Sequence, residues 1–258
     1  MLLNTAFDDL PKTYPHPLTI LSETRSTNDD LRRLCLDGAP HGTAVLAERQ
    51  TTGRGRMGRA FASEKGGVYL SFLVRGRKAA DPAALTITAA VAVGDAIADV
   101  TGKTCGIKWV NDLLLDGKKC CGILAEGVYD GNTPLPCGSI VGVGINVANT
   151  LPPSLSDIAA TLSAACGRPV PPVKVARALL QRMDEYFAPD APFPIDIYTA
   201  RCVTVGRTVT VQKGDETYEA EAVGIAPDGA LILCRNGQRE TLGWGEIRLL
   251  PEKTAHRN

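Results

Sequence analysis

The pattern of secondary-structure signals changes near residue 203, and this change limits the fold more than any other feature of the sequence. Before it, short β-rich apolar runs alternate with segments of helical periodicity. After it, short strands are separated by Lys-Gly-Asp, Pro-Asp-Gly and Asn-Gly turns, and no segment has a helical pattern. Turn residues at such short intervals are typical of a small all-β barrel. We therefore predict two domains, residues 1–202 and 203–258.

The first domain is predicted to have an α+β fold, in which a mixed sheet packs against helices. Its apolar, β-rich runs predict strands at residues 18–24, 43–50, 68–74, 106–110, 112–115, 121–128 and 139–147. Segments with helical spacing predict helices at residues 28–38, 81–100, 156–166, 172–187 and 193–201. Ser26 or Thr27 can cap the first of these helices, and Gly38 ends it. An Asp116-Gly117 turn indicates a hairpin.

The charge balance and the cysteines argue against several classes of protein. Lys plus Arg and Asp plus Glu both count 28 among 258 residues, so the chain lacks the basic character of a general nucleic-acid binder. No window approaches the length of a membrane span, and the first residues do not resemble a signal peptide. The eight cysteines include no C-x-x-C pair, so we predict reduced thiols in the cytoplasm and no metal site.

The segment GRGRMGR, residues 53–59, places three arginines among three glycines without an acidic residue. It matches G-x-G-x-x-G, but a dinucleotide-binding loop should open a helix and precede an acidic residue by about 20 positions, and the sequence shows neither. Glycine permits close approach of the backbone to a ligand, and the arginine fork matches phosphate oxygens. We predict a mobile loop that closes over a polyphosphate; the alternative is a solvated basic loop without a role.

A second stretch, residues 108–126, combines polar and basic residues with two apolar runs. Asn111 and Asp112 lie at the junction of two predicted strands, and two lysines follow the tight turn. Trp109 is one of only two tryptophans. Taken alone, these residues also fit a buried tryptophan, an ordinary turn and a hairpin surface. The stretch points to a function only in combination with the Gly/Arg loop at residues 53–59.

In this combination the sequence resembles the biotin protein ligases, which attach biotin to the carrier domains of carboxylases. The family motif G-R-G-R-x-G-R is matched at every fixed position, and K-W-P-N-D-L is matched except that Val110 replaces proline. The matching segments are Ser26–Asn28, Gln50-Thr51, Gly53–Arg59, Lys108–Leu113, Lys119–Glu126 and Gly142–Asn146. The all-β tail resembles the family's SH3-like C-terminal domain, so the resemblance covers nearly the whole chain.

The resemblance implies a catalytic domain of the class II synthetase and biotin/lipoate ligase type. Biotin would be activated as biotinyl-5′-AMP with ATP and Mg²⁺, and then transferred to a lysine of a biotin carboxyl carrier protein. Some family members carry an N-terminal domain that binds DNA, but only about 17 residues precede the first predicted strand here, so we expect no DNA binding. We also expect a cytoplasmic protein without membrane attachment, and a homodimer through an exposed strand edge.

The resemblance also assigns roles to individual residues. Biotin would be bound by Ser26, Thr27, Asn28, Gln50, Gly53, Arg54, Gly55, Arg56 and Lys119. ATP would be bound by Arg54, Arg56, Arg59, Lys108, Trp109, Asn111 and Asn146. Arg56, Lys119 and Asp112 would be catalytic, and Asp112 would either accept the proton of the incoming lysine or orient Lys119. No histidine lies near these motifs, so we expect positioning and electrostatic catalysis.

Some positions depart from the family pattern. Phe61 stands where tryptophan is common, and Cys120 and Cys121 replace an aliphatic and a small residue. Because no base adjoins these cysteines, we predict that they pack rather than react.

Three alternatives remain open. A lipoate-type ligase would perform the same two steps, but the polar side chains of residues 26–28 and Gln50 suit a ureido ring better than a dithiolane. A non-catalytic biotin-sensing protein would keep the pocket without turnover. An SH3-like binding module would use only residues 203–250.

Overall fold

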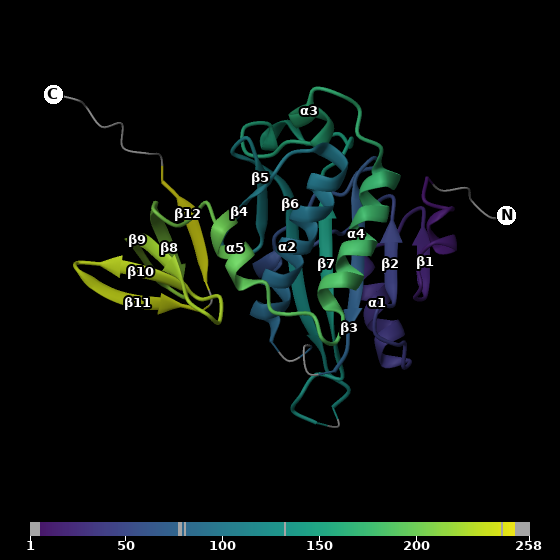
Figure 1. The fold of residues 1–258 in the computed structure, drawn as a ribbon, viewed down its shortest axis with the longest axis horizontal. Coiled ribbons are helices and arrows are strands. Elements are labelled where there is room, and N and C mark those ends of the chain that lie inside the picture. The colour runs from purple at the N-terminus through teal and green to yellow at the C-terminus, as the bar shows by residue number, and fades with distance from the viewer. Residues whose placement is uncertain (1–5, 77–78, 80, 132, 244, 251–258) are drawn as a thin grey trace.

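The computed structural model describes residues 6–250 except 77–78, 80, 132 and 244 (Figure 1). Seven strands form one sheet in the order β1-β2-β3-β7-β6-β5-β4, in which β1 and β2 are parallel and all other neighbours are antiparallel. The strands are β1 (Leu18–Leu21), β2 (Ala44–Ala47), β3 (Val68–Val74), β4 (Gly106–Lys108), β5 (Asp112–Leu115), β6 (Lys118–Val128) and β7 (Gly138–Ile145). The predicted mixed sheet is confirmed, although β1 and β2 each end three residues earlier than predicted.

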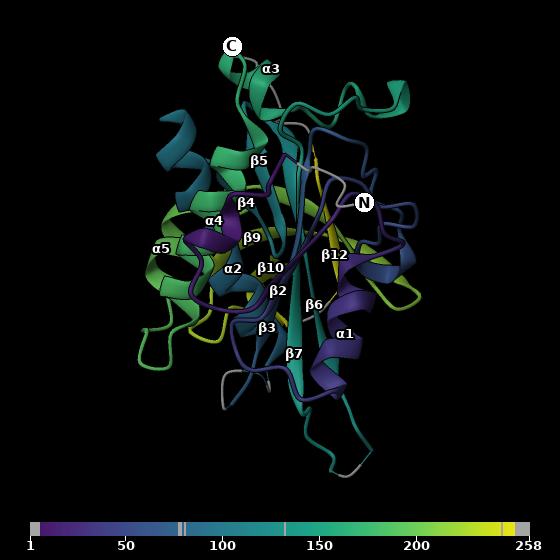
Figure 2. The ribbon, with the colours of Figure 1, turned by 90° about the vertical axis from the view of Figure 1, so that its right-hand side faces the viewer.

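Helices cover both faces of this sheet (Figures 1 and 2). α1 (Thr27–Leu36) packs on one face against β2, β3 and β7, whereas α2 (Pro82–Thr101) and α4 (Pro172–Phe187) pack together on the other face. α5 (Ile195–Arg201) lies beside β4, and α3 (Leu162–Cys166) lies at the top of the view in Figure 1. Short 3-10 turns occupy Leu10–Lys12, Arg56–Gly58 and Pro153–Leu155. The larger part of the chain is therefore an α+β layered fold, as predicted.

α2 is the core helix of this fold. The Asp81 side chain accepts hydrogen bonds from the N–H groups of Ala83 and Ala84, which caps the helix start, and Gly102 ends the helix at a φ of 73°. By length and composition α2 could span a membrane, contrary to our expectation from the sequence. However, 67% of its apolar window is buried inside the protein, where it packs against β6 and α4.

The helix predicted at residues 156–166 is shorter than expected, because α3 begins only at Leu162. The preceding residues pair instead with the start of β6. The Lys119 N–H donates to the Ile158 carbonyl at 2.8 Å, and the Ala160 N–H donates to the Lys119 carbonyl at 3.0 Å. Backbone pairing with the β5–β6 hairpin thus takes the place of the first helical turns.

The C-terminal residues form a second, antiparallel sheet of five strands in the order β11-β10-β9-β8-β12. Its strands are β8 (Thr208–Lys213), β9 (Glu216–Ile225), β10 (Leu231–Arg235), β11 (Gln238–Leu242) and β12 (Glu246–Leu249). No helix occurs in the described part of residues 203–250, which confirms the all-β prediction. The sheet lies beside α5 and β4 (Figure 1), where the Val203 N–H donates to the Ile107 carbonyl at 2.9 Å. The boundary between residues 202 and 203 stays a prediction.

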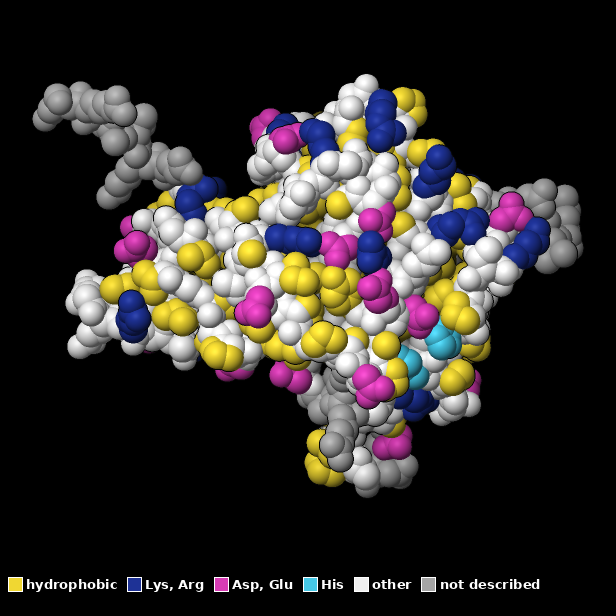
Figure 3. Space-filling model, in the orientation of Figure 1, with side chains coloured by type: hydrophobic (Ala, Val, Ile, Leu, Met, Phe, Trp, Pro, Cys, Tyr) yellow, Lys and Arg dark blue, Asp and Glu magenta, His cyan; other side chains and the backbone are white. Residues whose placement is uncertain are grey.

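The mixed surface charge and the free cysteines agree with the equal numbers of basic and acidic residues and with the predicted reduced thiols. Basic and acidic side chains are interspersed on the face shown in Figure 3. All eight cysteines are free thiols, and Cys120 and Cys121 are completely buried. Burial raises the pKa of the Cys121 thiol, whereas the pKa of Cys120 is raised first by its hydrogen bond with Cys105 and then by burial. Protonated buried thiols are poor nucleophiles, which supports packing rather than catalysis.

Candidate active site

A pocket gathers almost all of the predicted site residues. It opens where the start of α1, the Gly/Arg loop, the β4–β5 turn, β6 and β7 meet, and β12 of the second sheet contributes to its rim. The predicted residues that line it are Ser26, Thr27, Asn28, Gln50, Arg54, Gly55, Arg56, Arg59, Lys108, Trp109, Asn111, Asp112 and Lys119. Tertiary folding therefore joins segments of both predicted domains at one place.

Two predicted residues, Gly53 and Asn146, do not line this pocket. Gly53 lies behind the wall, where an added Cβ atom would stand 2.5 Å from the Ser63 hydroxyl oxygen. The Asn146 side chain is buried and its Oδ1 atom accepts a hydrogen bond from Asn149 Nδ2 at 3.1 Å. Both residues shape the backbone around the pocket.

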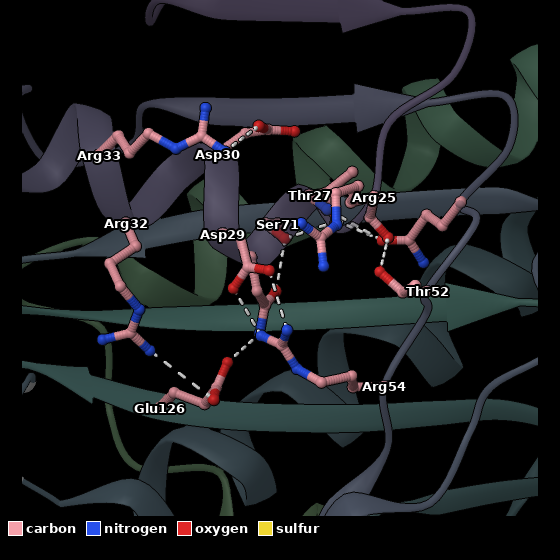
Figure 4. A network of polar contacts seen from close by, with 12 residues as sticks. Arg25, Thr27, Asp29, Asp30, Arg32, Arg33, Thr52, Arg54, Ser71 and Glu126 are labelled. Atoms are coloured by element: carbon pink, nitrogen blue, oxygen red, sulfur yellow. Dashed lines mark hydrogen bonds and ion pairs between the residues drawn. The ribbon is translucent and has the colours of Figure 1, made fainter.

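The wall formed by α1 is a hydrogen-bonded network of polar side chains (Figure 4). The side-chain oxygen of Gln50 accepts from the Thr27 N–H at 2.9 Å and from the Thr27 hydroxyl at 3.1 Å. Asn28 donates to Glu126 at 2.7 Å and accepts from the Ser71 hydroxyl at 2.5 Å. Our sequence analysis missed Ser71 and Glu126, and the only signal for Glu126 is its place at the end of the matching segment Lys119–Glu126. The network orders this wall without a ligand.

The Gly/Arg loop folds back on itself as a compact turn. The Gly55 N–H donates to the Arg59 carbonyl at 2.7 Å, and the Phe61 N–H donates to the Gly53 carbonyl at 2.9 Å. Between them Arg56–Gly58 forms one 3-10 turn. No α-helix starts from the loop, so its G-x-G-x-x-G pattern is not a dinucleotide-binding fingerprint.

The three arginines of the loop have different partners. Arg54 forms a two-pronged ion pair with Asp29 in the first turn of α1, at 2.6 and 2.8 Å. Arg59 pairs with Glu246 of β12, although 70% of its side chain is exposed. The loop is thus held at one end by the larger fold and at the other by the second sheet.

Arg56 lines the pocket without a carboxylate partner among residues 6–250 as described. Its Nη1 atom lies 3.5 Å from Asn111 Oδ1, and its Nη2 atom donates to the Gly245 carbonyl at 3.1 Å. Neutral acceptors do not compensate its charge. An anion in the pocket would therefore be stabilised by this guanidinium group.

Two lysines extend the positive charge across β4 and β6. Lys119 Nζ lies 2.5 Å from Asp112 Oδ1 and 5.9 Å from the centre of the Phe61 ring. The Asp112 oxygen accepts no well-aligned hydrogen bond from the described residues, so the contact is a close ion pair. Burial lowers the pKa of Lys108, and the nearby Asp112 partly offsets this effect. Five cationic side chains line the pocket against two carboxylates, which makes it positively charged.

Glycines in β6 and β7 leave room beneath the cations. A Cβ atom added to Gly144 would lie 2.5 Å from the Phe61 ring, and one added to Gly122 would lie 3.2 Å from Lys119 Nζ. Phe61 itself lines the pocket. A side chain at these positions would therefore push against Phe61 or Lys119, both of which line the pocket.

Trp109 joins the pocket to the second sheet. Its Nε1–H donates to the Gly229 carbonyl at 3.0 Å, and its backbone N–H donates to the Thr204 hydroxyl at 2.9 Å. Glu246 and Ile247 of β12 also line the pocket. Our sequence analysis placed no site residue in the C-terminal domain, because no local pattern in a barrel strand signals contact with a distant loop.

The pocket offers charge stabilisation and hydrogen bonding rather than a built metal centre. Among the described residues, no group of three or more His, Cys, Asp or Glu side chains is placed to hold a metal ion. The two carboxylates that line the pocket, Asp112 and Glu246, are each paired with a cation. None of the histidines in the described part of the chain lines the pocket.

Comparisons with known proteins agree with this geometry. The model of the biotin/lipoate A/B protein ligase family matches residues 21–146, and that of the biotin protein ligase C-terminal domain matches residues 204–250. The chain is 34% identical over 227 residues to the bifunctional ligase/repressor BirA of Bacillus subtilis, which covers 84% of this chain and 68% of that protein. It is 30% identical over 247 residues to the biotin–[acetyl-CoA-carboxylase] ligase of Paracoccus denitrificans, which covers 88% and 98%.

The fold is also that of a solved ligase. The biotin protein ligase of Aquifex aeolicus, in complex with biotin and ATP, matches with a TM-score of 0.79 and 28% identity, over 91% of this chain and 98% of that chain. The C-terminal family match spans all five strands of the second sheet, in agreement with an SH3-like domain. Identity and coverage of this extent place the chain in the biotin protein ligase family.

Proposed function

We propose that this chain is an ATP-dependent ligase that activates biotin as biotinyl-5′-AMP and transfers it to a lysine of a biotin carboxyl carrier protein. The observation that carries the proposal is the polarity of the pocket. A neutral hydrogen-bonding wall at α1 stands beside a cationic wall with Arg56, Lys108 and Lys119. A molecule with a neutral polar ring and a carboxylate tail fits this order, and its tail would reach the cations.

The chemistry requires two steps. First, a carboxylate oxygen of biotin attacks the α-phosphorus of ATP, and pyrophosphate leaves. Then the neutral amine of the carrier lysine attacks the carbonyl carbon of the mixed anhydride, an amide forms, AMP leaves and a proton is released. The first step brings an anion towards a polyanion, which is costly at low dielectric unless cations are held in place.

The residues divide between the substrates according to their charge. The neutral wall, formed by Ser26, Thr27, Asn28 and Gln50, would hold the ureido ring. Lys119 and Arg56 would stabilise the reacting carboxylate and the α-phosphate, while Gly55 keeps the backbone close to the ligand and Gly53 supports the loop from behind. ATP would be held by Arg59, Lys108, Trp109 and Asn111, with Asn146 supporting the backbone nearby. Mg²⁺ would enter as part of the substrate MgATP, because ATP phosphates and water supply most of its ligands in such sites.

For Asp112 the structure favours orientation of Lys119 over proton transfer. Its carboxylate lies 2.5 Å from Lys119 Nζ, which holds the ammonium group near the pocket. We expect Asp112→Asn to slow adenylation and transfer alike, because a misplaced Lys119 affects both steps. Single-turnover assays of each step test this. Normal adenylation with slow transfer would assign Asp112 the role of base, and normal biotinylation would exclude both roles.

The acceptor and the assembly follow from the same proposal. Relatives are named for ligation of biotin to acetyl-CoA carboxylase, and we propose a carrier of that kind. We further propose a cytoplasmic enzyme that binds neither DNA nor membranes. A homodimer would form at β1, since it is an edge of the larger sheet, whereas the β4 edge meets residue 203 of the C-terminal segment.

The decisive experiment is biotin-dependent exchange of labelled pyrophosphate into ATP by the purified protein with Mg²⁺. Lipoate and octanoate are assayed in parallel. Exchange with biotin alone is the expected result. Exchange with lipoate instead would support the two-step mechanism but show that the pocket binds lipoate. Biotin binding without exchange would indicate a non-catalytic biotin-sensing protein.

A further inference from the structure

Asp29, which belongs to none of the family motifs, holds the first arginine of the Gly/Arg loop. Arg54 Nη1 donates to Asp29 Oδ2 at 2.8 Å, and Arg54 Nη2 donates to Asp29 Oδ1 at 2.6 Å (Figure 4). Two parallel hydrogen bonds between charged groups restrict orientation as well as distance. The hydrogen bonds from Arg54 also lower the pKa of the Asp29 carboxyl group. Asp29 therefore stays ionised, and the ion pair stays intact, at a lower pH than an aspartate with an ordinary pKa would allow.

The Asp29 carboxylate is mounted on a well-held part of the molecule. It follows Thr27 and Asn28 in the first turn of α1, and both of these residues are buried. Their side chains are bound to Gln50 and Glu126, as described for the neutral wall. The partner of Arg54 is thus fixed to the pocket wall itself.

A displacement of Arg54 would be transmitted along the loop to Arg56. Arg54 and Ala60 form an antiparallel bridge, and the Gly55 N–H donates to the Arg59 carbonyl at 2.7 Å. Arg56 lies inside this closed turn. Release of Arg54 would therefore let the turn move as a unit and carry Arg56 with it.

We propose that Asp29 is a positioning residue: its ion pair with Arg54 fastens the Gly/Arg loop to α1, so that Arg56 stays directed into the pocket and the adenylate is retained. This inference rests on the proposed function, since retention presupposes that an adenylate forms. Arg54 then acts as an arm of the loop rather than as a phosphate ligand. The Arg54 and Asp29 side chains are 38% and 36% exposed, so the pair should favour the closed loop by about fivefold, as strong surface ion pairs do.

The test compares Asp29→Asn with Asp30→Asn, a matched control in the same helical turn. Both substitutions remove one negative charge near the start of α1, so both weaken the interaction with the helix dipole. Asp30 contacts Thr24 and Arg33, which lie outside the loop, and asparagine can still accept the Thr24 hydrogen bond. Asp29→Glu keeps the charge and should restore most of the wild-type behaviour.

Two measurements are made on each purified full-length variant. The first is the rate at which biotinyl-5′-AMP is released without a carrier protein. The second is the rate of trypsin cleavage after Arg56 and Arg59, which reports on the loop and requires no activity. We expect Asp29→Asn to increase both rates by about fivefold over the Asp30→Asn control.

A double-mutant cycle asks whether Asp29 acts through Arg54. In an Arg54→Gln background, Asp29→Asn should change neither rate further. Equal rates for Asp29→Asn and Asp30→Asn would overturn the inference, and so would an undiminished effect of Asp29→Asn in the Arg54→Gln background. A wild-type protein that forms no adenylate would contradict the proposed function instead, and the cleavage rates would still decide the role of Asp29.

Discussion

The two walls of the pocket differ in how far their polar groups are satisfied before a ligand arrives. At α1, Thr27 and Asn28 are joined by hydrogen bonds to partners that are themselves part of the fold. At the cationic wall, Arg56 contacts only neutral acceptors among the described residues, and the half-buried Lys108 lies near Asp112 and the cations Lys119 and Arg59. The first wall is built like part of the core, whereas in the second the cations outnumber the two carboxylates, Asp112 and Glu246.

Because of this difference, we expect the neutral wall to contribute mainly to stability and the cationic wall mainly to activity. A satisfied network of buried hydrogen bonds stabilises the folded chain. Cations held close together oppose folding until an anion binds between them. Substitutions in the neutral wall should therefore lower stability, whereas substitutions in the cationic wall should lower activity and spare stability. ATP should raise the unfolding temperature through the cationic wall.

The largest expected effect is that of Lys119→Met in the cationic wall. Removal of one preorganised charge near a reacting centre typically costs about 100–1000-fold in rate, so biotin-dependent pyrophosphate exchange should fall by about 100-fold or more. Lys118→Met is the control, because Lys118 lies on the same hairpin as Lys119 but donates to the Ser156 carbonyl, which does not line the pocket. A loss no larger for Lys119→Met than for Lys118→Met would show that the cationic wall does not drive adenylation.

Arg56→Gly should mainly affect retention of the intermediate. A hydrogen bond to a charged group contributes about 1.5–3 kcal/mol, so release of the adenylate should increase by about tenfold or more. Adenylation should persist in part, because Lys108 and Lys119 remain. Biotinylation of bystander proteins in solution measures the leakage. Unchanged leakage would exclude a lid role for Arg56.

Asn28→Ala should lower the stability of the protein by about 1–3 kcal/mol, because it removes the hydrogen-bond donor to Glu126 Oε2 and one of the two acceptors of the buried Ser71 hydroxyl. Urea unfolding, followed by far-ultraviolet circular dichroism, measures the change. The matching substitution in the other wall is Lys108→Met, which should not destabilise the protein. Equal destabilisation by both would remove the contrast between the walls.

The smallest effect concerns pH. Burial lowers the pKa of Lys108 in the folded protein, so this lysine loses its charge at a lower pH than an ordinary lysine. Its unfavourable effect on folding is present below the folded-state pKa and fades as the pH rises past the unfolded-state value. The KM for ATP should rise on the alkaline side, and Lys108→Arg should move that rise to higher pH. Identical pH profiles would exclude Lys108 as the titrating group.

Much of the fold was predictable because each element leaves a local pattern. The apolar run at β3, the caps of α2 and the closely spaced turns after residue 203 act between neighbours in sequence. The exception is the helix predicted to start at residue 156. The residues just before Leu162 pair with β6 instead, because backbone pairing with a tertiary partner outweighed their weak helix propensity.

The sequence was enough to predict most residues of the site, but not the ion-pair partners of those residues. The Gly/Arg loop stood out because glycines and arginines without an acidic residue suit a phosphate ligand, whereas Lys119 was assigned a role through the family resemblance. Asp29 and Glu246 did not stand out, since they are ordinary acidic residues in a helix and a strand. They lie 25 and 187 residues from the arginines that they bind.

Local chemistry along the chain was thus enough to specify the strands, the core helix, the barrel and the supply of cations for the pocket. The fold alone decided which of the three loop arginines is left for a ligand: Arg54 pairs with a carboxylate from α1, Arg59 pairs with one from β12, and Arg56 pairs with neither among the described residues. The physical reason is that turn and periodicity signals act between sequence neighbours, whereas charges and hydrogen bonds act through space.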